Sequence, residues 1–123
     1  MLDSQTKGMR DLETLREYGC RYRFIDYIPH LSELIFLASI SDLKGPRYRI
    51  TFQTTLYIQT VTDWFHGGFE LAGPEKYTEL VDALDLNTAA KEQLLLFVAS
   101  PLNKPEVLVL CHTVYVSQET PLP

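Results

Sequence analysis

The sequence predicts an α+β protein that is predominantly antiparallel β, with a strongly curved sheet or partial barrel and two or three flanking helices. Two stretches repeat apolar residues at the helical period, and residues 47–61 alternate apolar and polar side chains at the strand period. Several shorter apolar segments are bounded by glycine and proline. A length of 123 residues fits one domain, residues 1–123, with residues 118–123 expected as a loose, proline-containing tail.

Residues 6–18 and 75–85 are expected as amphipathic helices. The first ends at Gly19, because glycine accepts the left-handed conformation that closes a helix. The second follows Gly73 and Pro74, and proline suits the first turn of a helix. The apolar stripes consist of Met9, Leu12, Leu15 and Tyr18 in the first helix and Tyr77, Leu80, Val81 and Leu84 in the second.

The most regular strand pattern covers residues 47–61. Its length exceeds that of an ordinary strand, and the apolar alternation lapses at residues 53–55, where we expect a bulge or tight turn. The helix at 75–85 is expected to dock on the apolar face of this strand. That face consists of Tyr48, Ile50, Phe52, Leu56 and Ile58.

The remaining strands are expected at residues 20–28, 33–41, 69–72, 94–99 and 107–116. Residues 33–41 and 94–99 are apolar on both faces, so a helix is the competing interpretation of each. This order of short strands, with helices at the start and in the later half, is similar to a small cupin-like half-barrel. The clustered histidine and glutamate metal motif of cupins is missing, so no metal ligand is carried over from that architecture.

Composition narrows the class of protein. The net charge of −5 and the pI near 5.1 argue against a dedicated nucleic-acid binder. No apolar run is long enough to cross a membrane, and the amino terminus does not read as a secretory signal. Cys20 and Cys111 are too few for a disulfide framework, which favours a reduced, cytoplasmic protein.

Catalytic motifs are scarce. No phosphate-binding loop and no signature of a nucleophilic serine or cysteine occurs, and no cofactor is predicted. Asp63, His66 and Glu70 form the one local cluster of suitable metal ligands, with His112 as a further candidate. The competing interpretation is a turn histidine beside solvated acids, since the cluster spans a glycine pair.

Two arginine pairs stand out. Arg21 and Arg23 flank one tyrosine, and Arg47 and Arg49 flank another, so each pair should project from the outer face of a strand. If the two strands lie near each other, the four guanidinium groups share a surface suited to a small anionic ligand. The alternative is an ordinary solvent face with local ion pairs, to acids such as Asp26.

Aromatic residues that do not fit the inward pattern, chiefly Tyr57 and Trp64, are candidates for the same binding role. The sequence therefore favours a non-enzymatic binding or interaction domain. Its expected partners are a protein, a second copy of the chain or a small anion, and not nucleic acid or membrane. The alternative is a small-ligand-binding protein or metal-dependent enzyme with a pocket inside the curved sheet.

Overall fold

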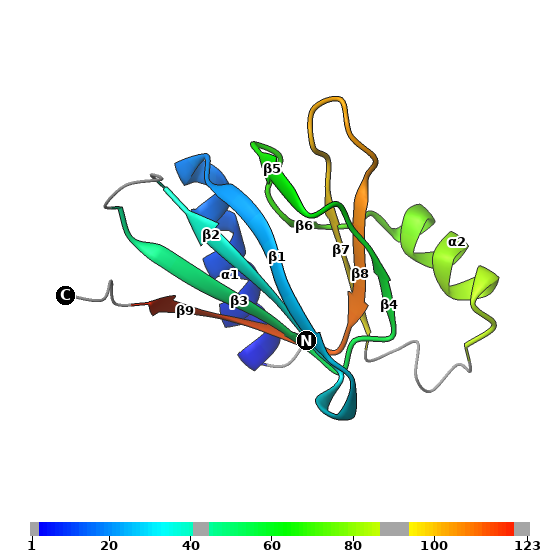
Figure 1. Ribbon diagram of the computed structural model, residues 1–123. Helices are drawn as coiled ribbons and strands as arrows, with labels where there is room; N and C mark the ends of the chain where they lie inside the picture. Colours follow the sequence, from blue (N-terminus) through cyan, green and yellow to red (C-terminus); the bar gives the residue numbers. More distant parts are fainter. Residues whose placement is uncertain (1–2, 41–44, 87–93, 120–123) are drawn as a thin grey trace.

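A computed structural model describes residues 3–40, 45–86 and 94–119 of the chain (Figure 1). The elements in chain order are α1 (Asp3–Tyr18), β1 (Arg21–Ile28), the short 3-10 helix η1 (Pro29–Leu31), β2 (Glu33–Ser39), β3 (Arg47–Gln53), β4 (Tyr57–Gln59), β5 (Asp63–Phe65), β6 (Glu70–Leu71), α2 (Pro74–Ala83), β7 (Leu95–Ala99), β8 (Val107–Cys111) and β9 (Thr113–Glu119).

The strands form two antiparallel sheets. Sheet A has the order β5-β1-β2-β3-β9, and sheet B has the order β4-β8-β7-β6. Helix α1 packs against β9 on the inner face of sheet A and also contacts β6 of sheet B, whereas α2 lies on the opposite side of sheet B (Figure 1). The outer face of sheet A carries no helix among the described residues.

The chain passes from one sheet to the other at two neighbouring positions, between β3 and β4 and between β8 and β9. After β3 the chain turns at Thr54, which has a φ of 52°, and continues as β4 in sheet B. The partner β8 likewise continues as β9 in sheet A, through His112. The His112 backbone N–H donates a hydrogen bond of 3.1 Å to the Gln53 carbonyl at this crossing. The two sheets therefore share one bent two-stranded ribbon.

The main core fills the space between the two sheets and α1. Phe52 is fully buried there, and its ring centroid lies 5.9 Å from that of Phe36 and 5.0 Å from that of Phe69. Leu12 and Leu15 extend this core onto α1. Burial of each large apolar side chain stabilises the fold by roughly 1.5–3 kcal/mol, so this aromatic cluster is the main source of stability.

A second, smaller core lies between sheet B and α2. It consists of Val81, Leu94, Leu96, Val98 and Leu110. Alternate residues of β7 thus serve different cores, which explains why this strand is apolar on both faces.

The α+β class and the mainly antiparallel sheets predicted from the sequence are confirmed. Residues 33–41 and 94–99 contain strands, β2 and β7, and not helices. Neither sheet closes or curls strongly, so the cupin-like partial barrel is not confirmed. Neither helix of the described residues is long and apolar enough to cross a membrane.

Three finer predictions are wrong. Leu56 is 49% exposed, because the turn at Thr54 resets the alternation before β4 begins. Helix α2 docks on sheet B, and not on β3. The single strand expected at 107–116 is two strands, and β9 continues to Glu119, so residues 118 and 119 belong to the sheet. The rest of the expected tail lies outside the described residues.

Candidate functional site

Alternation along β1 and β3 directs the arginines to the outer face of sheet A. Tyr22 is buried in the main core, and Tyr48 packs against it. Because successive side chains of a strand point to opposite faces, the arginines on either side of each tyrosine point outward. Of the four, Arg23, Arg47 and Arg49 are exposed and Arg21 is half-buried.

The strand register brings the two pairs together. Strand β2 lies between β1 and β3, and its outward residues Leu37 and Ser39 separate the arginines. One row across the sheet runs Arg21, Ser39, Arg47, and the next runs Arg23, Leu37, Arg49. The Cα atoms of the two arginines in a row are about 10 Å apart, and those of the two arginines on one strand are about 7 Å apart. We call these six residues the arginine face.

Two of these arginines are held by acids from the edge strands of sheet A. The Arg21 guanidinium donates to both carboxylate oxygens of Asp63 on β5, at 2.9 and 2.5 Å. Arg49 donates to Glu119 on β9 at 2.9 Å. The hydrogen bond from Arg21 is the main cause that lowers the pKa of Asp63, and the nearby charge of Arg23 also lowers it. Asp63 is therefore firmly ionised at neutral pH.

The other two arginines, Arg23 and Arg47, make no hydrogen bond and no ion pair with the residues that the structure describes. Both side chains are exposed. A guanidinium group presents five N–H donors in a planar fork that matches a carboxylate or a phosphate. The arginine face therefore has two complete sets of unused donors.

Acids and aromatic rings surround this cationic centre. Asp26 lies on the same outer face, in the row next to that of Arg23, whereas Glu33 lies one row further away and accepts a hydrogen bond from the Gln53 side chain. Phe65 is 52% exposed beside Arg21, whose guanidinium lies 5.2 Å from the ring centroid, and Tyr115 is 45% exposed on β9. The outer face of sheet A therefore carries charged, polar and aromatic side chains, with the four arginines at its middle.

Trp64 and Tyr57 do not belong to this surface. Trp64 is 2% exposed on the inner side of β5, stacks on Tyr22 at 5.3 Å and donates from its indole N–H to the Gly67 carbonyl at 3.0 Å. Tyr57 is half-buried on β4 in sheet B and packs against the second core. The structure therefore places neither residue on the arginine face. Alternation along β5 directs Trp64 inward, and Tyr57 belongs to sheet B.

The structure does not bring the predicted metal ligands together. Asp63 bonds Arg21 on sheet A, whereas Glu70 lies on β6 of sheet B, 3.7 Å from the guanidinium of Arg16. His66 occupies the intervening turn with a φ of 59°. Among the described residues, no group of three or more histidine, cysteine, aspartate or glutamate side chains is placed to hold a metal ion.

The two cysteines, Cys20 and Cys111, are free and fully buried. Burial raises the pKa of both thiols, so each stays protonated and neither is an activated nucleophile.

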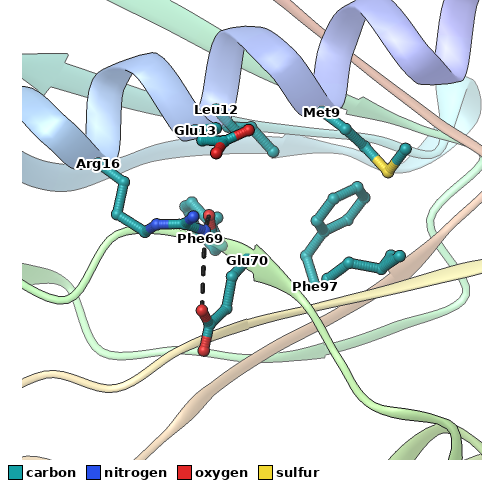
Figure 2. Close-up of a pocket in the computed structure, with 8 residues that line it drawn as sticks. Met9, Leu12, Glu13, Arg16, Phe69, Glu70 and Phe97 are labelled. Atoms are coloured by element: carbon teal, nitrogen blue, oxygen red, sulfur yellow. Dashed lines mark hydrogen bonds and ion pairs between the residues drawn. The ribbon is translucent and has the colours of Figure 1, made fainter.

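A hollow of about 290 Å³ lies between α1 and sheet B (Figure 2). Apolar side chains line it on both sides. Arg16 lies across it, donates to the Phe69 carbonyl at 3.2 Å and forms an ion pair with Glu70. The space between the sheets, where a ligand pocket was expected, is filled by the aromatic core. The apolar lining of the hollow consists of Met9, Leu12, Phe69, Leu71 and Phe97.

Sequence reasoning anticipated the arginine face but missed the acids that complete it. Asp26 is on the outer face, yet the acids that bond the arginines are Asp63 and Glu119. Their positions on opposite edge strands follow from the strand order, which no local pattern reveals. Comparisons with models of known protein families, with curated proteins and with solved structures find no match to this chain.

Proposed function

We propose that the protein is a non-enzymatic binding domain that holds an anionic partner on the arginine face. The observation that carries this proposal is the strand register, which places four arginines from two separate strands around Leu37 and Ser39. Arg23 and Arg47 carry positive charges that no described acid bonds, so an anionic partner adds ion pairs that the described protein does not make there.

The chemistry of the two unpaired arginines supports the proposal. A charge-assisted hydrogen bond to a guanidinium group contributes about 1.5–3 kcal/mol, which exceeds a neutral hydrogen bond. Arg23 and Arg47 lie on either side of β2, so one partner that crosses this strand reaches both. The anionic groups of a protein, of a second copy of this chain or of a small ligand all meet this requirement. The two free, buried thiols support a cytoplasmic location for the protein, and therefore also for such a partner.

The test compares the wild-type protein with an Arg23→Ala/Arg47→Ala variant by isothermal titration at low salt. Hexaglutamate peptide and inorganic pyrophosphate serve as probes. We expect the wild type to bind at least one probe and the variant to lose about tenfold or more in affinity, which corresponds to one charge-assisted contact. The free energy of unfolding should change by less than about 1 kcal/mol, because both side chains are exposed.

Arg10→Ala is the matched control, because Arg10 is an exposed arginine of α1, which packs on the other face of sheet A. Its removal should leave the affinity unchanged. Equal binding by the wild type and the double variant would contradict the proposal, as would the failure of both probes to bind the wild type.

A further inference from the structure

We infer that the partner of the arginine face is an extended protein segment that carries two acidic side chains about 12 Å apart, with basic residues outside them. This inference rests on the proposed function and specifies the class of partner. Three features of sheet A support it: the diagonal placement of the unpaired arginines, their exposure beside exposed apolar side chains, and the acids at the margin of the face.

The diagonal placement follows from how the edge acids bond. Asp63 stands opposite Arg23 in the strand register, yet it bonds Arg21 in the next row. Glu119 stands opposite Arg47, yet it bonds Arg49. Each acid thus neutralises the neighbour of the arginine that it faces.

The two unpaired arginines consequently lie at opposite corners of the face. Two strand spacings and one step of two residues separate Arg23 from Arg47, which puts their Cα atoms about 12 Å apart. Four residues of extended chain span about 13 Å. A segment that crosses β2 obliquely therefore meets both guanidinium groups with side chains four positions apart.

The exposure of the unpaired arginines disfavours a small anion. Arg23 and Arg47 are both exposed, so a phosphate or carboxylate group bound to them alone stays in contact with water. An ion pair in contact with water is weaker than one that a bound segment shields from water. A longer segment adds apolar contacts with Leu37, and with Phe65 or Tyr115, both of which are exposed.

The margin of the face disfavours a uniform polyanion such as nucleic acid. Asp63 and Glu119 stand at the two edges of the arginine rows, and Asp26 lies on the same outer face beside the row of Arg23. Regularly spaced phosphates would bring negative charge against these carboxylates. Basic residues at the ends of a segment instead complement them, so the margin selects a protein whose acidic centre has basic flanks.

The experiment uses a short, fluorescently labelled, threonine-rich peptide with a lysine at each end and two glutamates four positions apart. Fluorescence polarisation at low salt measures its affinity for the protein. We expect replacement of either glutamate by glutamine to weaken binding about tenfold, the loss of one charge-assisted contact. Arg23→Ala and Arg47→Ala should each weaken binding of the two-glutamate peptide by the same factor. Arg10→Ala should have no effect.

Three competitors separate this inference from the proposed function. The bound peptide is titrated with hexaglutamate, single-stranded oligothymidylate and inorganic phosphate. Sedimentation at several concentrations measures the oligomeric state of the wild-type protein without peptide. We expect weaker binding of all three competitors and a monomer in sedimentation. Tighter, arginine-dependent binding of a competitor, or an arginine-dependent oligomer, overturns the inference while the proposed function stands. If no probe binds in an arginine-dependent way, both are wrong.

Discussion

At the scale of single residues, Gly8 determines how closely α1 approaches sheet A. A Cβ atom at this position would collide with the carbonyl oxygen of Val114 and would lie 2.8 Å from its Cγ1 atom. The backbone of α1 therefore rests directly on the edge strand β9. This contact is consistent with the hydrogen bond of 2.6 Å from the Gln5 side chain to the His112 carbonyl nearby.

We predict that Gly8→Ala destabilises the protein by about 2 kcal/mol or more, because the added methyl group forces α1 away from β9. In an unconstrained helix the same change stabilises by about 0.5–1 kcal/mol. Urea unfolding measures the difference. Gly73→Ala is the control, since no atom lies within 4 Å of a Cβ built there, and it should cost less than about 1 kcal/mol. A Gly8→Ala protein as stable as the wild type would show that α1 does not lie this close to β9.

The Arg21–Asp63 ion pair predicts how the stability of the fold depends on pH. Because the folded protein lowers the pKa of Asp63, the pair stabilises the fold above the ordinary aspartate pKa of about 3.9. The contribution, at most about 1 kcal/mol for so exposed a pair, is lost as the pH falls through the lowered folded pKa.

Titration of the Asp63 carboxyl by NMR checks this prediction. Arg21→Gln should raise the pKa of Asp63 towards its ordinary value, because it removes the largest cause of the shift. Arg49→Gln provides the control, since Arg49 bonds Glu119 and not Asp63. An Asp63 pKa that is the same in the wild type and in Arg21→Gln would contradict the ion pair.

At the scale of elements, the periodicity of the sequence predicted both helices and the inward face of β3. Period-two alternation reports which face of a strand is buried, so Ile50 and Phe52 were identified correctly. The same alternation could not reveal that the chain leaves sheet A at Thr54. Likewise, the stretch from Val107 to Val116 is apolar on both sides of His112 and Thr113, and two polar residues fit a continuous strand as well as a break between two strands.

Phe52→Ala should destabilise the protein by about 3–5 kcal/mol, because it leaves a cavity among Phe36, Phe69 and Phe97. Tyr115→Ala removes a ring of similar size from the exposed face of the same sheet and should cost less than about 1 kcal/mol. Thermal or chemical unfolding of both variants gives the comparison. Similar losses in the two variants would mean that the inner and outer faces of sheet A are assigned the wrong way round.

At the scale of the whole molecule, the order of the strands in each sheet could not be predicted from the sequence. The two arginine pairs became one surface because β2 alone separates β1 from β3, and neighbouring strands in the chain often pair. In contrast, β5 and β9 reach the two edges of sheet A from distant parts of the chain. The ion pairs of Asp63 and Glu119 depend on these long-range pairings, so only the structure could identify them.

The closed main core predicts that both thiols are protected in the native protein. Cys20 and Cys111 are fully buried, and burial raises the pKa of each, so they should react with a disulfide reagent only when the molecule opens. Modification should be slow in buffer and should accelerate in urea. A Ser117→Cys variant, exposed on β9, should react at once and serves as the reference. Native thiols that react as fast as this reference would contradict a closed core.

The bonding pattern of the two edge acids gives the arginine face an approximate half-turn symmetry about the middle of β2. A rotation of 180° exchanges Arg23 with Arg47, each bonded acid–arginine pair with the other, and Leu37 with Ser39. A segment that crosses the face in either direction thus meets the same order of charges. Only the contrast between the Leu37 side chain and the Ser39 hydroxyl distinguishes the two directions, so this pair of β2 residues decides the polarity with which a partner chain binds.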